Sequence, residues 1–281
     1  MKLYTVNTGH FKLDGGAMFG VVPKSIWNKL NPADENNMCS WAMRCLLIEY
    51  GKRLILIDNG MGGKQDDKFF SYYYLHGDDN LVKSLAKYGF GVDDITDMVL
   101  THLHFDHCGG SIKYNSDRTK LEPVFKNATY YCNAKHWEWA THPNAREKAS
   151  FLKENIMPIK ESGQLSYFDE HSELVPGLRF LEVNGHTEAM MLPVVTQNGK
   201  TLAFMADLIP SSGHIPLPYV MGYDMRPLQT LQEKERILNE AAEKNWTLFF
   251  EHDPLTECVS VEKTEKGVRK KESFTLSDLG F

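Results

Sequence analysis

Four side chains that can bind metal ions fall within six consecutive residues of the chain: His102, His104, Asp106 and His107. His102 and His104 alternate along an extended segment and therefore point the same way. Asp106 and His107 follow where two glycines must end the strand, and neighbouring side chains on a turn diverge. No single ion can use all four well. The spacing therefore predicts two metal centres side by side, an arrangement that supports hydrolysis by generating hydroxide at neutral pH.

Three further candidate ligands lie in matching contexts elsewhere in the chain. His186 follows an apolar run, Asp207 ends a second, and His252 ends a third. Each run would bury a strand and release one ligand at its carboxyl end, where open α/β sheets place their binding sites. We therefore expect these three side chains to join the cluster. The remaining histidines, taken singly, are more simply explained as surface or core residues.

The elements that must position these ligands follow an α/β pattern in which most strands pair with their neighbours, typical of layered sheets covered by helices. Glycines make residues 15–22 irregular, and Asp78 or Asp79 would cap the first long helix. Predicted strands span 3–7, 41–50, 54–58, 98–101, 129–132, 178–183, 191–196, 202–206 and 247–250, with a hairpin over 258–274 and helices at 80–88, 134–141, 145–155 and 228–244.

The composition indicates an ordinary globular protein of 281 residues, with 42% hydrophobic and 24% charged residues. No low-complexity linker divides it, so we expect one domain over residues 1–281. A net charge of −6 disfavours non-specific nucleic-acid binding. The five cysteines form no CxxC pair, which favours a reduced protein over a disulfide framework. With no apolar leader and no run long enough to cross a membrane, the cytoplasm is the expected location.

The chain resembles the metallo-β-lactamase-fold hydrolases over residues 1–255. The residues that carry the resemblance are the HxHxDH cluster, its three partners in order, and the sequence Leu56-Ile57-Asp58-x-Gly60, similar to an early motif of that superfamily. The resemblance implies an α/β fold with an αββα four-layer sandwich and the metals between its two sheets. It also implies a ligand assignment, with His102, His104 and His186 on the first metal, Asp106, His107 and His252 on the second, and Asp207 bridging both.

The ligand types bear on the metal and on the catalytic roles. Imidazole and carboxylate suit zinc, and also iron or manganese. Diiron relatives usually place Glu where this chain has His104, so two zinc ions and hydrolysis are favoured over redox chemistry. The expected nucleophile is a hydroxide between the metals. Asp106 would also move a proton, Asp207 would bridge, and Asp58 would hold ligand histidines in place, with turn capping as the alternative role for Asp58.

The lactonase and organophosphate-hydrolase branch of the superfamily is the most similar, partly through residues 14–24. Lactonases of this branch often carry a tyrosine shortly after the bridging aspartate, and this chain has none there. Tyr223 or His214 could take its place, although a structural or pocket-lining role is the simpler explanation for each. Phe19 and Phe105 are further candidates for substrate contact. An apolar pocket would favour a small neutral ester, lactone or phosphotriester.

Two other functions remain open on the sequence. One is a metal-containing ligand-binding protein of the same fold with little or no turnover. The other is a thioesterase similar to glyoxalase II, although the basic residues that such enzymes use for glutathione are not identifiable here. The partner expected in every case is a small molecule, with neither nucleic acid nor membrane. The glycine-rich, apolar N-terminal loop makes a homodimer possible.

Overall fold

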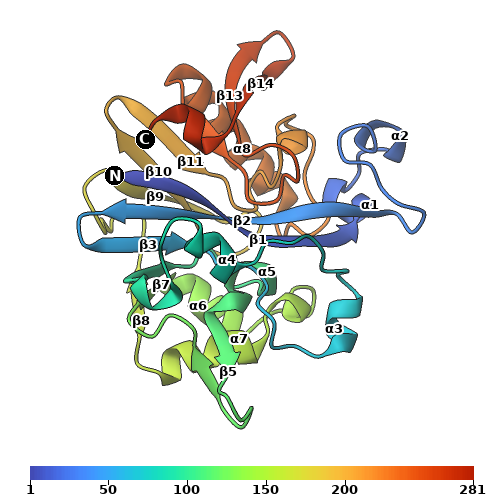
Figure 1. Ribbon diagram of the computed structural model, residues 1–281. Helices are drawn as coiled ribbons and strands as arrows, with labels where there is room; N and C mark the ends of the chain where they lie inside the picture. Colours follow the sequence, from blue (N-terminus) through green and yellow to red (C-terminus); the bar gives the residue numbers. More distant parts are fainter.

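Two six-stranded sheets pack face to face in the computed structural model, which describes residues 1–281 (Figure 1). The strand orders are β1-β2-β3-β4-β7-β8 and β14-β13-β12-β11-β10-β9. Helices α4, α6 and α7 lie outside the first sheet, and α8 lies outside the second (Figure 1). The predicted αββα sandwich is confirmed. Each sheet comes from one part of the chain, the first from residues 2–168 and the second from residues 178–274.

The first sheet begins antiparallel and continues parallel from β3 onwards, whereas in the second only β11 and β12 are parallel. The first sheet holds β1 (Lys2–Asp14), β2 (Met38–Tyr50), β3 (Arg53–Ile57), β4 (Asp97–Val99), β7 (Thr129–Asn133) and β8 (Leu165–Phe168). The second sheet holds β9 (Leu178–Val183), β10 (Met190–Gln197), β11 (Lys200–Phe204), β12 (Thr247–Phe249), β13 (Cys258–Thr264) and β14 (Gly267–Phe274).

A small hairpin and eight α-helices complete the chain. No helix combines the length and apolar character that a membrane crossing requires. The hairpin is β5 (Ile112–Tyr114) and β6 (Leu121–Pro123). The helices are α1 (Gly15–Phe19), α2 (Lys24–Trp27), α3 (Asp67–Ser71), α4 (Leu81–Ala86), α5 (Phe105–Cys108), α6 (Ala134–Thr141), α7 (Lys153–Glu161) and α8 (Pro227–Glu243).

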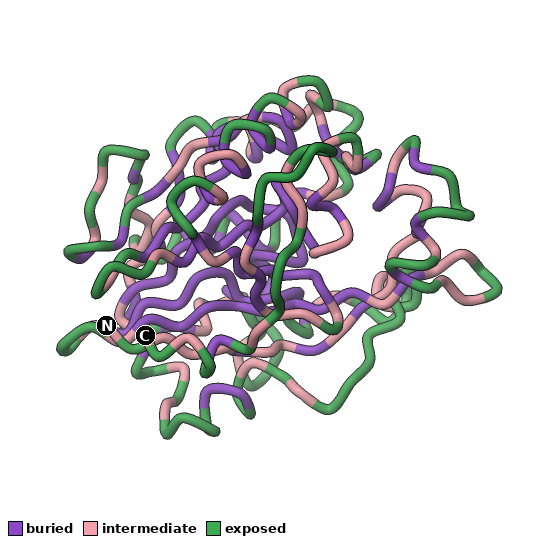
Figure 2. Tube along the Cα trace, turned by 90° about the horizontal axis from the view of Figure 1, so that it is seen from above, coloured by how far each residue is buried: buried purple, intermediate pink, exposed green.

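Strand β2 contributes to two separate cores because its side chains alternate between the faces of the first sheet. Leu46 and Ile48 join the core between the sheets, whereas Cys45 and Leu47 join the core under the outer helices. Burial on both faces explains why this strand is a nearly continuous apolar run. Figure 2 shows the buried chain concentrated in the middle of the molecule and the exposed chain in peripheral loops. The strand ends that carry the candidate ligands are therefore fixed by packing.

Most predicted elements agree with the structure, and three predictions were wrong in whole or in part. Residues 15–22 are irregular only from Gly20 onwards, because Gly15–Phe19 forms α1, capped by Asp14, whose Oδ1 accepts from Ala17 N at 2.8 Å. Residues 145–155 do not form one helix. The side chain of Asn144 closes a turn there by accepting from the next backbone N–H groups, and α7 begins only at Lys153. The cap of α4 is Asn80 rather than Asp78 or Asp79.

Candidate metal centre

The histidine-rich segment leaves the first sheet at the end of β4 and turns at α5. His102 and His104 lie on the extended stretch between the two elements, and Asp106 and His107 lie in α5. The following glycines are required by close packing, because a Cβ on Gly109 would lie 2.1 Å from the carbonyl oxygen of Met61. The turn that separates the two pairs of ligands is therefore held by the backbone around it.

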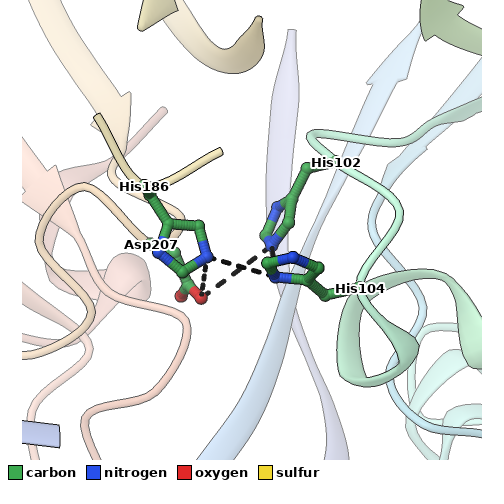
Figure 3. A group of neighbouring side chains, drawn as sticks. All are labelled: His102, His104, His186 and Asp207. Carbon is green, nitrogen blue, oxygen red and sulfur yellow. Dashed lines mark hydrogen bonds and ion pairs between the residues drawn. The ribbon is translucent and has the colours of Figure 1, made fainter. Parts of the chain in front are cut away.

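The other three candidates come from the second sheet. His186 follows β9, Asp207 follows β11, and His252 follows β12. All seven side chains lie at one edge of the sandwich and are buried. The structure thus brings together every metal ligand predicted from the sequence. Figure 3 shows four of them converging, His102 and His104 from one side and His186 and Asp207 from the other.

The seven side chains form two groups around Asp207. In the first group, Nδ1 of His104 lies 3.1 Å from Nε2 of His102 and 3.2 Å from Nε2 of His186. Oδ2 of Asp207 lies 3.1 Å from Nε2 of His186. The ligand atoms of these four residues all lie within 4.8 Å of one another, a spacing that a single cation can span.

The second group faces both oxygens of Asp207. Nε2 of His252 lies 3.1 Å from Nε2 of His107 and 3.1 Å from Oδ1 of Asp207. Oδ2 of Asp106 lies 3.8 Å from both imidazole nitrogens. Oδ2 of Asp207 also lies 3.5 Å from Nε2 of His107, so the carboxylate contacts both groups. Its other oxygen, Oδ1, is buried without a hydrogen-bond partner. A buried carboxylate oxygen is costly without a compensating charge.

The outer nitrogen of four of the five ring ligands faces a carboxylate or backbone carbonyl oxygen, and that of His102 faces the hydroxyl oxygen of Thr101. These acceptors fix the proton on the outer nitrogen. In neutral rings the inner nitrogens then carry lone pairs, and lone pairs about 3 Å apart repel unless a cation lies between them. The donor set therefore fits two metal ions. The contacts are His104 Nε2 to Glu147 at 3.0 Å, His186 Nδ1 to Asp224 at 2.9 Å, His252 Nδ1 to the Ala42 carbonyl at 2.7 Å, and His107 Nδ1 to Asp58 at 3.2 Å and Glu251 at 3.0 Å.

The electrostatics of the site favour positive charge at its centre. Burial lowers the pKa of His102 and of His104, so both rings are neutral at pH 7. At His186 burial lowers the pKa and the Asp207 carboxylate raises it, with a net value of about 10. Burial opposes but His104 favours ionisation of Glu147, whose pKa falls to about 2. The centre therefore attracts protons or metal ions, and Glu147 remains an acceptor.

Asp58 lies behind the ligands rather than in the pocket and is fully buried. Its carboxylate accepts from the backbone N–H of Thr101 at 2.9 Å and from its hydroxyl at 2.6 Å. The same hydroxyl oxygen lies 3.0 Å from Nδ1 of His102, and Asp58 also faces His107. One carboxylate thereby orients a histidine of each group. Asp58 is placed as a positioning residue, not as a group that reaches the substrate.

Sequence reasoning missed three of the carboxylates that hold the histidines. Glu147 lies in the segment predicted as helix, where no pattern distinguished it, and Asp224 lies far along the chain from His186. Only Glu251 carried a signal, since it directly precedes His252. Burial raises the pKa of Glu251 to about 8, and the neighbouring His107 opposes this shift.

A cavity of about 360 Å³ opens onto both groups of ligands. Asp106 and Asp207 form part of its floor, and its walls are largely apolar. Two phenols reach it, Tyr73 and Tyr223, and burial raises the pKa of both, that of Tyr73 to about 12. The phenols are therefore hydrogen-bond donors at neutral pH. The apolar walls are Leu13, Met18, Phe105, Ala149, Met221 and Met225.

Only two of the four predicted substrate-contact residues line this cavity, namely Phe105 and Tyr223. Phe19 and His214 do not, and both are fully buried. Their rings stack 4.3 Å apart, Nε2 of His214 lies 2.9 Å from the Met18 carbonyl oxygen, and Nδ1 lies 2.7 Å from the hydroxyl of Ser211. These two residues support the wall to which Met18 belongs instead of facing the cavity.

Comparison with known proteins agrees with this geometry. N-acyl homoserine lactonase of Bacillus thuringiensis is 25% identical over 267 residues, 90% of this chain and 93% of that protein. A probable metal-dependent hydrolase from Staphylococcus aureus superposes with a TM-score of 0.88 at 28% identity, covering 97% and 96% of the two chains. AidC, a dizinc quorum-quenching lactonase, superposes at 0.79 with 21% identity over 97% and 95%. The family model of the metallo-beta-lactamase superfamily matches residues 44–252, and the chain belongs to this superfamily of metal-dependent hydrolases.

Proposed function

We propose that the protein is a di-zinc hydrolase that cleaves a small ester, lactone or phosphotriester. The observation that carries the proposal is the position of Asp207, whose carboxylate lies 3.1 Å from His186 of one group and 3.1 Å from His252 of the other, on the floor of one cavity. Two bound cations would lower the pKa of a shared water and polarise the carbonyl or phosphoryl oxygen of the substrate. The donor set, imidazole and carboxylate without thiolate, suits zinc.

The chain's own residues would keep the centre in its working geometry. Glu147 and Asp224 fix the tautomers of His104 and His186, and Asp58 does the same for His107. Asp106 lines the cavity beside the second group, so its free carboxylate oxygen can receive a proton and return it to the leaving oxygen. No serine or cysteine nucleophile is needed, and the five cysteines are all buried.

The cavity supports a neutral reacting group. Leu13, Met18 and Met221 give it apolar walls that exclude water and can contact an acyl or alkyl chain. Tyr223 presents a protonated phenol, which can donate to the substrate's carbonyl oxygen. It would take the role of the tyrosine missing after Asp207, where this chain has Leu208. Since the curated relatives are N-acyl homoserine lactonases, a lactone is the first substrate to test.

The experiment is an activity assay on protein of known metal content. We expect hydrolysis of N-hexanoyl homoserine lactone, para-nitrophenyl butyrate or diethyl para-nitrophenyl phosphate, lost on treatment with a chelator and restored by zinc or manganese. Asp207→Asn should abolish turnover, because the bridging charge is lost. Glu170→Gln, which changes an exposed carboxylate, is the matched control. Full turnover after chelation would contradict the mechanism, and no turnover of any of the three by zinc-loaded protein would favour a binding function.

A further inference from the structure

Arg146 is the only lysine or arginine that lines the cavity. It lies between α6 and α7, and its guanidinium donates across the mouth of the cavity to the carbonyl oxygen of Gly222. Gly222 is itself held, because its N–H donates to the Ala17 carbonyl of α1 at 2.8 Å. The side chain of Arg146 is thus exposed, but its guanidinium is tethered to the loop that carries Gly222.

No carboxylate of the protein pairs with Arg146. Arg53 and Arg226, in contrast, form ion pairs with Asp97 and Glu188. The acidic neighbour of Arg146 in sequence, Glu147, is committed elsewhere: one oxygen accepts from His104 at 3.0 Å and the other from Trp139 at 2.6 Å. Arg146 thus presents an uncompensated positive charge at the cavity.

The guanidinium also keeps donors to spare. It carries five N–H donors in a planar fork, and the protein accepts only from the terminal nitrogen that faces Gly222. Such a fork matches the two oxygens of a carboxylate, an interaction that a lysine ammonium reproduces less well. Met18 and Met221, which are both buried, also line the cavity. The cavity therefore combines a cation at its exposed rim, apolar side chains in its walls and the candidate metal ligands.

We propose that Arg146 is a specificity-determining residue that binds a carboxylate on the substrate, at the end remote from the bond that is cleaved. The substrate class is then a small ester or lactone with an apolar spacer and a terminal carboxylate. This inference rests on the proposed hydrolase function, since the position of the reacting group comes from it. The apolar walls contact the spacer, and the guanidinium of Arg146 binds the carboxylate at its end.

The test uses matched pairs of esters that differ only in the terminal charge. Para-nitrophenyl half-esters of succinic, adipic and suberic acid are compared with the same compounds capped as methyl esters. With zinc-loaded wild type we expect, at the spacer length that reaches Arg146, a ratio of kcat/KM for acid over methyl ester of about ten, in line with a charge-assisted hydrogen bond. Arg146→Met should bring the ratio to about one, and Arg146→Lys should give an intermediate ratio.

Lys148→Met is the matched control, because it removes an exposed positive charge two residues away that does not line the cavity. Its ratio should equal that of wild type. An equal ratio in wild type and Arg146→Met, with methyl esters hydrolysed, overturns the role of Arg146 and leaves the hydrolase function standing. If neither ester is hydrolysed, the hydrolase function fails. Calorimetric binding of the corresponding anilides, acid against methyl ester, then decides on Arg146, with a tenfold preference supporting it and equal affinities overturning it.

Discussion

At the scale of single residues, the metal centre depends as much on the groups behind the histidines as on the histidines themselves. Glu147 and Asp224 place the proton on the outer nitrogen of His104 and His186. Without these acceptors either nitrogen could carry the proton, and a fraction of the rings would turn an N–H toward the metal. The affinity of the site for a metal ion is therefore set partly by residues that do not contact the ion.

Replacement of Glu147 by Gln should weaken metal binding by about tenfold, because an amide is a poorer acceptor for His104 and its NH₂ would face the indole N–H of Trp139. Zinc affinity is measured by competition with a chromophoric chelator. Glu138→Gln is the control, since Glu138 is an exposed carboxylate on the nearby α6. Equal zinc affinity in both variants and wild type would show that Glu147 is not needed to orient the ring.

The sequence indicated the candidate ligands, but of the carboxylates that support them it indicated only Asp58, for a physical reason. Four ligands lie in one short segment, and the other three end apolar strands, so residue type and local context identify them. Glu147 reaches His104 only because the loop before α7 folds back over the first sheet's edge. Similarly, Phe19 and His214 looked like pocket residues because their type suits a pocket, but packing turned them into the wall behind Met18.

At the scale of elements, buried lysines hold the segments that surround the site. Lys234 of α8 is fully buried, and its ammonium donates to the carbonyl oxygens of Pro216, Leu217 and Tyr219. This contact fixes the segment that leads to Met221 and Tyr223 in the cavity wall. Lys64 acts in the same way beneath the metal-binding turn, where it donates to the Gly109 carbonyl oxygen at 2.6 Å.

Lys64 makes the free energy of unfolding depend on pH in a defined direction. Burial lowers its pKa from 10.5 to about 8 in the folded protein. Between these values the unfolded chain binds the proton and the folded chain does not, so stability from this group rises with pH. Relative to Lys64→Met, wild type should gain about 2 kcal/mol between about pH 7 and pH 9.5 in urea unfolding. A pH-independent difference between the two proteins would contradict this assignment.

The two wrongly predicted segments, 15–22 and 145–155, failed because their structure depends on contacts that local sequence does not show. Gly15 and Gly16 indicated an irregular loop, but a Cβ on Gly15 would lie 2.4 Å from the ring of Trp27. The residue is glycine because α1 packs closely on α2, and only the folded partner reveals this. The strands of the second sheet were predicted well, since alternation and apolar runs are local signals. The prediction of a helix over 145–155 failed because nothing in the local sequence showed that the side chain of Asn144 closes a turn there.

At the scale of the whole molecule, each group of ligands draws on both sheets. The first group combines His102 and His104 with His186 and Asp207, and the second combines residues of α5 with His252, which also faces Asp207. A bound ion would therefore join the part of the chain that forms the first sheet to the part that forms the second. Binding energy that exists only in the folded state adds to the stability of the fold.

Zinc should accordingly stabilise the whole protein. At a free zinc concentration about 100 times the dissociation constant, the free energy of unfolding should rise by about 3 kcal/mol over the metal-free protein. Thermal or urea unfolding of chelator-treated protein, with and without added zinc, measures the change. In Asp207→Asn the gain should largely vanish, whereas the exposed-site variant Glu170→Gln should retain it. A similar gain in Asp207→Asn would mean that zinc binds elsewhere.

The αββα class itself was predictable from the family motif and the order of strands, and the structure confirms it. The expectation of one domain over residues 1–281 stays a prediction. What the sequence could not supply is the approach of Arg146 to Gly222, 76 residues apart, because nothing local to either residue indicates that their loops meet.

The division of the sheets along the chain has a consequence for how the enzyme matures. A nascent polypeptide that has emerged only as far as β8 has four of the seven ligands and no bridging carboxylate, so it cannot assemble either site. Neither group of ligands is complete until the chain from β9 onwards has folded. Metal binding would therefore require that both sheets have formed and packed together. The candidate metal centre would be completed only after the core between the sheets.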